Sequence, residues 1–169
     1  MTISKATWLQ QSLINLDLMT DEIYQSTVSD LLDEQPYLMG FLFNMEEEFD
    51  ENPHELLIRA TLAFYRALRQ TGLLFEIVKP DMLEEVISSK VDMFNQIDRE
   101  DEAFDETQLF ATASSPETVQ GLLNYIDENT RNQEFTEATR NNMLLILSAL
   151  VEIFDNAASL PGTKENTEE

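Results

Sequence analysis

Residues 143–154 have the sequence MLLILSALVEIF, the longest apolar stretch in the chain. Only Ser148 and Glu152 interrupt it, and it is too short to span a bilayer as a helix. Thr136 is a suitable N-cap for a helix that continues to about Ala158. A helix that is apolar on nearly every side has to be enclosed by other elements. We therefore expect residues 143–154 to lie in the central, most enclosed helix of the protein.

Apolar residues recur at helical spacing through most of the remaining sequence, and strand patterns are nearly absent. The spacing predicts an all-α fold, an irregular multi-helix bundle of about six to seven helices. Proline-initiated helices at Pro53 and Pro116, each followed by a longer apolar helix, leave two helical hairpins or a HEAT-like pair as an alternative. Besides 136–158, the expected helices are 4–19, a segment after Thr20 that stops at Pro36, 36–49, 53–71, 81–97 and a segment from Pro116 through Ile126.

Two boundaries are marked by particular residues. Asn52-Pro53-His54-Glu55 predicts a helix start, with Asn52 as N-cap, Pro53 at the first helical position and Glu55 completing a capping box. Gly72 predicts the end of the same helix. The segment 73–78 that follows could be a short strand or a buried connection. Because no second convincing strand is present to pair with it, we expect a short extended connection.

The domain organisation follows from where the helical pattern stops. Residues 1–158 are expected to form a single helical domain, which is an ordinary length for one core. Residues 159–169 contain Pro161, Gly162 and several charges, which is typical of a frayed acidic C-terminal tail.

The composition excludes several kinds of chemistry. The chain of 169 residues has 33 Asp and Glu against 10 Lys and Arg, a net charge of −23, and no Cys. Without Cys there is no disulfide, thiol nucleophile or Cys-ligated zinc. Phosphate binding depends on Lys and Arg, so the charge argues against direct nucleic-acid binding and against anionic membrane surfaces. The first residues do not resemble a secretory signal, and we expect a cytoplasmic protein.

The sequence does not have the residue spacing that the known metal-binding and cofactor-binding motifs require. A zincin helix needs a second His four residues after His54, where Ile58 stands, and His54 is the only His in the chain. Ferritin-like di-iron sites need two Glu-x-x-His pairs. An EF-hand loop beginning at Asp98 would place Ala103 and Leu109 where Gly and Glu are required. The sequence also lacks Gly-rich phosphate loops and serine-nucleophile motifs. It predicts no catalytic residues, metal or cofactor, and a surface position for His54.

Three of the ten cations share one face of the helix expected at 53–71. At 100° per residue, Arg59 and Arg66 lie about 20° apart, and Arg69 lies about 60° further round. All three lie opposite the apolar face that runs from Leu57 to Phe64. They are candidates for an anion-binding site. The alternative is ion pairing with neighbouring acidic helices, which reduces the self-repulsion of the chain.

The segment after Pro36 is the candidate partner-binding surface. It is apolar on nearly every side, and Phe and Met make adaptable apolar contacts. The alternative is an ordinary core helix. The candidate residues are Tyr37, Leu38, Phe41, Leu42 and Met45.

These observations favour a non-catalytic helical protein that works by binding another protein, as an adaptor or regulator. Its acidity would steer a basic partner toward it, and self-association is a second possibility. One alternative is a DNA mimic that inhibits a basic nucleic-acid-binding protein, with the acidic clusters at 46–51 and 98–106 imitating phosphates. Another is a carboxylate-dependent metal binder or enzyme.

Overall fold

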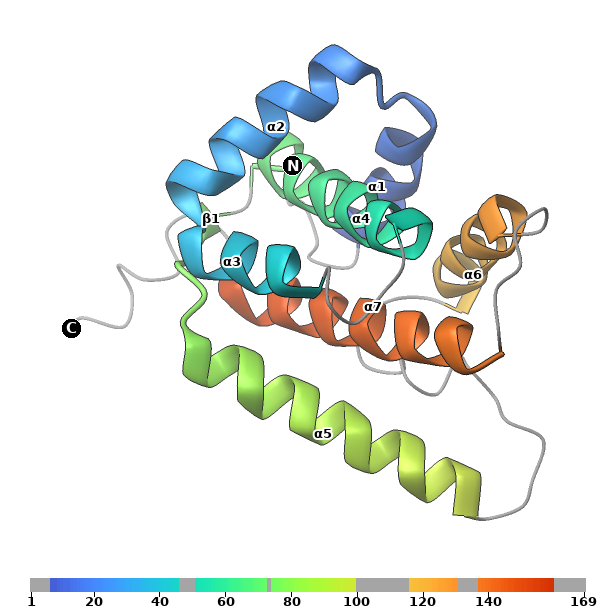
Figure 1. Ribbon diagram of the computed structural model, residues 1–169. Coiled ribbons are helices and arrows are strands. Elements are labelled where there is room, and N and C mark those ends of the chain that lie inside the picture. The colour runs from blue at the N-terminus through green and yellow to red at the C-terminus, as the bar shows by residue number, and fades with distance from the viewer. Residues whose placement is uncertain (1–6, 46–50, 73, 100–115, 131–136, 160–169) are drawn as a thin grey trace.

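The computed structural model of the chain describes residues 7–45, 51–72, 74–99, 116–130 and 137–159. Within these ranges the chain is helical apart from two short strands and a few brief connections, which confirms the expected all-α multi-helix bundle (Figure 1). The elements are α1 (Thr7–Asp17), α2 (Asp21–Glu34), α3 (Pro36–Asn44), α4 (Glu51–Gln70), β1 (Leu74–Phe75), α5 (Pro80–Arg99), α6 (Pro116–Thr130), α7 (Glu137–Ala157) and β2 (Ala158–Ser159).

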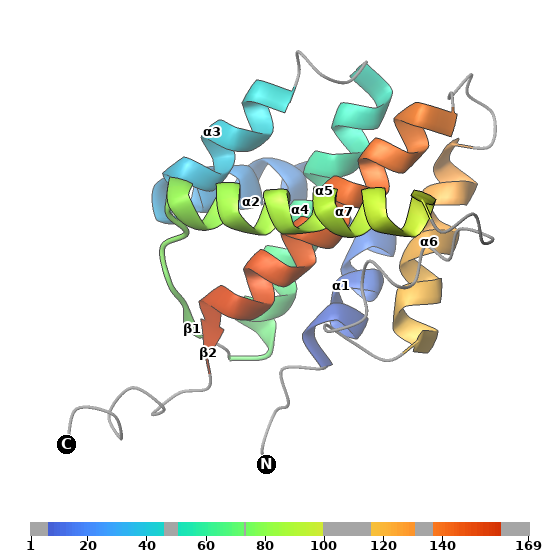
Figure 2. The ribbon, with the colours of Figure 1, turned by 90° about the horizontal axis from the view of Figure 1, so that it is seen from below.

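Helices α4 and α7 pack against each other at the centre. Helices α1 and α2 lie on α4, α5 crosses the outer side of α7, and α6 contacts α1 (Figures 1 and 2). Leu144, Leu150 and Phe154 of α7 are fully buried, which confirms that residues 143–154 are enclosed but not that theirs is the most enclosed helix. Helix α4 is enclosed to a similar degree, because Leu57 and Phe64 on its apolar face are also fully buried.

Local sequence signals account for some helix ends and not for others. The Thr20 side chain accepts a hydrogen bond from the Ile23 backbone N–H at 3.2 Å and caps α2. Gly72 follows α4 with a φ of +78°, a backbone conformation that favours glycine. The predicted start of α4 is wrong by two positions, because the helix begins at Glu51 rather than Pro53 and Asn52 therefore lies inside it. Thr136, the expected cap of α7, lies outside the described residues.

We expect Thr20→Ala to lower the free energy of unfolding by about 1 kcal/mol, because the Ile23 N–H loses its side-chain acceptor. Thr20→Ser keeps an acceptor oxygen and should recover most of that loss. Urea unfolding followed by circular dichroism measures both values. Equal losses in the two variants would contradict a capping role for the Thr20 oxygen.

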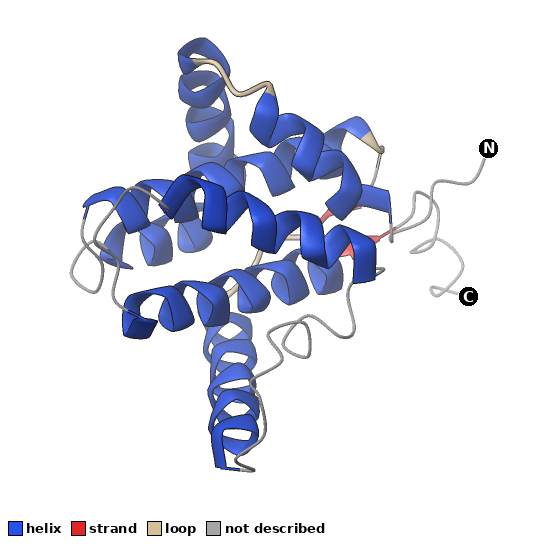
Figure 3. Ribbon diagram, turned by 90° about the vertical axis from the view of Figure 1, so that its right-hand side faces the viewer, coloured by secondary structure: helices blue, strands red, loops and turns tan. Residues whose placement is uncertain are grey.

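The extended connection expected at 73–78 is paired, which corrects the sequence-based expectation. Leu74 and Phe75 form an antiparallel pair with Ser159 and Ala158, and the Glu76 N–H donates to the Ala157 carbonyl at 2.9 Å. Figure 3 shows this small strand pair beside the helices that make up most of the described chain. The start of the C-terminal tail was therefore expected too early in the chain, because Ser159 belongs to β2. The rest of the expected tail, residues 160–169, lies outside the described residues.

The Gln35 side chain holds the same connection against the junction of α2 and α3. Its Nε2 donates to the Glu76 carbonyl at 2.7 Å, and its Oε1 accepts from the Val78 backbone N–H at 2.8 Å. Gln35 is 1% exposed. A buried amide that serves one backbone donor and one backbone acceptor fixes the position of the chain between β1 and α5.

Two further polar contacts tie the helices together. His54, expected at the surface, is partly buried, and its Nε2 lies 2.7 Å from the Leu42 carbonyl oxygen, to which it can donate. The Lys90 ammonium on α5 lies 3.4 Å from the Glu152 carboxylate on α7, with the Lys90 side chain only 3% exposed. The single acid inside the apolar stretch 143–154 therefore compensates a buried cation.

Candidate anion-binding site

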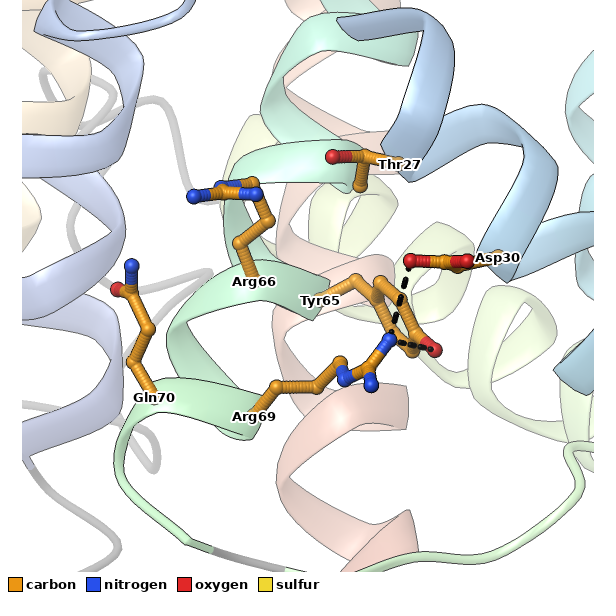
Figure 4. Close-up of a pocket in the computed structure, with 6 residues that line it drawn as sticks. All are labelled: Thr27, Asp30, Tyr65, Arg66, Arg69 and Gln70. Atoms are coloured by element: carbon orange, nitrogen blue, oxygen red, sulfur yellow. Dashed lines mark hydrogen bonds and ion pairs between the residues drawn. The ribbon is translucent and has the colours of Figure 1, made fainter. Parts of the chain in front are cut away.

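A pocket of about 190 Å³ lies over helix α4, between α4 and α2 (Figure 4). Helix α2 contributes a hydroxyl and a carboxylate to its lining, and α4 contributes two guanidinium groups, a phenol and an amide. Two of the three predicted anion-binding arginines are therefore together. The lining residues are Thr27, Asp30, Tyr65, Arg66, Arg69 and Gln70.

Arg69 is engaged by the acidic residues of α2. Its Nη1 lies 3.1 Å from Asp30 Oδ2 and 3.9 Å from Glu34 Oε1. The same guanidinium lies over the Tyr65 ring, 5.6 Å from the ring centroid, and Nη1 donates to the Tyr65 hydroxyl at 3.4 Å. The charge of Arg69 is thus compensated by this protein itself, as the ion-pairing alternative predicted.

The Tyr65 hydroxyl connects this network to α2. It donates a hydrogen bond to Glu34. Burial of the phenol raises the pKa of Tyr65 above its ordinary value, and the bond to Glu34 raises it further. Interaction with Tyr65, and then with Glu34, raises the pKa of Arg69. At neutral pH Tyr65 therefore stays a neutral donor, and the positive charge of Arg69 is already neighboured by two carboxylates.

Unlike Arg69, Arg66 has no carboxylate partner in the part of the chain that the structure describes. Its side chain is partly buried and lines the pocket, and it makes no hydrogen bond or ion pair with any of the described residues. Figure 4 shows the Arg66 and Arg69 side chains leaving α4 in different directions, so the Asp30 carboxylate that holds Arg69 does not serve Arg66. As far as the described residues go, this guanidinium is left available for an external acceptor.

The Gln70 amide is oriented so that its donor faces the pocket. Its Oε1 accepts from Gln11 Nε2 at 3.1 Å and from Asn15 Nδ2 at 2.9 Å, both on α1. Figure 4 shows the oxygen turned toward α1 and the amide nitrogen on the side of Arg66. Two donor groups, one of them cationic, therefore face the same space, which is an arrangement that suits an anionic acceptor.

The Thr27 hydroxyl lies opposite these donors and acts as an acceptor toward the pocket. Its Oγ1 donates to the Ile23 carbonyl at 2.6 Å, which uses its only proton. Figure 4 shows this oxygen pointing from α2 toward Arg66. Nothing in the local sequence of Thr27, Asp30 or Gln70 indicates a pocket, because their proximity depends on how α1 and α2 lie against α4.

Arg59, the third predicted anion-binding residue, is not part of this pocket. Its Nε lies 3.2 Å from Glu55 Oε1, and its guanidinium lies over the Tyr24 ring at 5.2 Å from the centroid. Two turns of helix place it about 10 Å from Arg66 along the axis, so a shared face does not bring the two into one site. Burial raises the pKa of Tyr24, and the Glu55 carboxylate raises it further.

The candidate partner surface at residues 37–45 is only partly accessible. Leu38 and Leu42 are fully buried, which corrects their assignment as partner-binding residues: four residues apart, they share the face of α3 that enters the core. Phe41 and Met45 are partly buried and pack against the core, while Tyr37 is 52% exposed. The large apolar side chains that stay accessible in segment 37–45 are therefore Tyr37 and Phe43, which is 44% exposed.

The described residues bear on the alternative functions only in part. Most of the acidic clusters at 46–51 and 98–106 lies outside the described residues, so the DNA-mimic interpretation stays a prediction. Across the described ranges, no group of three or more His, Asp and Glu side chains could hold a metal ion. Within the same ranges, none of the helices combines the length and the apolar character that a bilayer span requires.

Comparison of the chain with protein-family models, with curated proteins and with solved structures finds no match.

Proposed function

We propose that this protein is a non-catalytic interaction module that receives an anionic group of its ligand in the pocket between α2 and α4. The observation that carries the proposal is Arg66, a partly buried residue that lines this pocket and whose guanidinium has no partner among the described residues. Removing a charge partly from water without a partner costs free energy. An external anion would supply the missing partner.

The side chains that line the pocket favour a binding site over a catalytic site. The lining contains no Ser, Cys, Lys or His that could serve as an activated nucleophile. Tyr65 has a raised pKa, and Asp30 is held by Arg69, so neither is arranged as a general base near neutral pH. We further propose that this interaction takes place in the cytoplasm.

Titration with sodium acetate, followed through the arginine Nε–Hε resonances in NMR spectra, tests the proposal directly. We expect the Arg66 resonance to shift saturably, because acetate can accept two hydrogen bonds from its guanidinium. The Arg59 and Arg69 resonances should shift less, since both guanidinium groups already hold carboxylates. Sodium chloride at matched ionic strength is the control for screening.

Arg66→Gln should weaken acetate binding about tenfold or more, the cost of losing a charge-assisted hydrogen bond. Lys79→Gln is the matched control, because it removes the same charge from an exposed position outside the pocket. A parallel shift of all arginine resonances, or an Arg66 resonance that does not respond, would rule out an anion site at this pocket.

A further inference from the structure

We infer that the anionic group which enters the pocket is a side-chain carboxylate, Asp or Glu, that lies among Lys and Arg residues on the surface of a basic protein. This inference rests on the proposed function and names the partner of that same site. Three features of the described residues carry it: the charge left uncompensated in the pocket, the acidic surroundings of the pocket, and its size.

The residues that line the pocket carry one positive charge in excess, because two guanidinium groups stand against the single carboxylate of Asp30. Arg69 is held by two carboxylates, Asp30 and Glu34, whereas Arg66 is held by none among the described residues. A single uncompensated guanidinium matches a monoanion. A phosphate dianion would bring a second negative charge close to Asp30, where like charges repel. The fork of the Arg66 guanidinium and the neighbouring Gln70 amide nitrogen fit the two oxygens of a carboxylate.

The surroundings of the pocket have the opposite sign. Helix α2, which forms one wall, carries five acidic residues and no basic one. All five are exposed: Asp21, Glu22, Asp30, Asp33 and Glu34. Together with the net charge of −23, they repel a free anion that approaches from solution. They attract cations, so a carboxylate reaches Arg66 most favourably when cationic side chains flank it and lie against α2.

The size of the pocket selects a side chain over a larger ligand. Its volume of about 190 Å³ is smaller than the 300–1,000 Å³ that drug-sized ligands and cofactors usually occupy. A carboxymethyl or carboxyethyl group fits within it. The bulk of the ligand then lies outside, against the acidic wall of α2, which is the arrangement expected for a protein surface.

Two labelled peptides test the inference with the full chain. One has a central Glu between Lys residues, and the other has Gln at the same position. Binding is measured by fluorescence anisotropy in about 50 mM salt and again in about 200 mM salt. Non-specific attraction to an acidic protein favours the Gln peptide, which has one negative charge fewer. We expect the reverse, with the Glu peptide binding about tenfold more tightly through Arg66.

The variants separate the pocket from the general charge. In Arg66→Gln the preference for the Glu peptide should disappear, while in Lys79→Gln, with the same charge change, it should persist. Arg66→Lys keeps the charge but loses the planar fork, and we expect it to retain only part of the preference. A Glu peptide flanked by Ala should bind more weakly than the Lys-flanked peptide, and the difference should shrink as salt is raised.

Failure of this inference is distinguishable from failure of the proposed function. If acetate shifts the Arg66 resonance but the two peptides bind equally, the carboxylate-on-a-basic-surface assignment is wrong and the anion site stands. Inorganic phosphate that displaces acetate more strongly than the Glu peptide does would also overturn the assignment. Lack of any acetate response overturns both. Light scattering of the free protein adds a further arm, because dimers that dissociate in Arg66→Gln would identify a second copy of this chain as the occupant instead.

Discussion

Replacing Phe154 by Ala is expected to lower the free energy of unfolding by about 3–5 kcal/mol, the largest effect among the changes considered. Phe154 is fully buried on α7 and joins three elements. Its ring stacks on Phe75 of β1 with centroids 4.8 Å apart, and it meets the edge of Phe64 on α4 at 5.7 Å. Truncation removes both aromatic contacts and leaves a cavity between the two central helices.

Urea unfolding at neutral pH gives this free energy, and two further variants interpret it. Ile77→Ala removes an aliphatic side chain that is 58% exposed, and it should change stability by less than about 0.5 kcal/mol. Phe154→Leu keeps most of the volume and isolates the contribution of ring geometry. A loss below about 1 kcal/mol for Phe154→Ala would contradict the central position of this ring.

The second large effect is expected at Gln35. Gln35→Ala leaves the Val78 N–H and the Glu76 carbonyl without their side-chain partner, at a cost of about 2–3 kcal/mol. Val78 is fully buried, so water cannot replace the lost acceptor at its N–H without a change of structure. Gln25→Ala, at an exposed position within α2, is the control and should be close to neutral.

Gln35→Glu adds a pH test of the same contact. A carboxylate can still accept from Val78, but it faces the Glu76 carbonyl oxygen without a proton to share. Burial and this repulsion raise the pKa of the introduced acid above its unfolded value of about 4.3. The stabilisation from the protonated acid is then fully present below a pH of about 4.3, the unfolded-state pKa, and it is lost as the pH rises through the folded-state pKa. Stability that rises with pH from acid to neutral in this variant, relative to wild type, would contradict the Gln35 geometry.

The helices follow from local sequence because their signals lie within a few residues. Thr20 caps the helix that it precedes, and Gly72 follows the helix that it ends. The apolar spacing of α4 and the stretch 143–154 correctly indicate which faces are buried. These features depend on helical periodicity and backbone chemistry, both of which can be evaluated along the chain.

Long-range pairings have no comparable local signal. Leu74 and Phe75 pair with residues more than eighty positions later, and a two-residue strand has no period to detect. Lys90 has an ordinary surface-type sequence environment, and only the odd position of Glu152 inside an apolar stretch indicates a buried partner. For the pocket, the shared helical face placed Arg66 and Arg69 together. It also included Arg59, because angular position does not measure distance along the axis.

The segments that pair as β1 with β2, and as α4 with α7, are synthesised at different times. Helix α4 leaves the ribosome some 87 residues before α7 is complete, as the bounds Gln70 and Ala157 indicate. At about 5–20 residues per second, that delay lasts on the order of ten seconds. During this time the apolar face of α4 that packs against α7 in the folded protein is not yet covered by α7. Helices α1 and α2, which precede α4 in the chain and pack on it, are already synthesised at this stage, so only the face of α4 that contacts α7 has to wait for its partner.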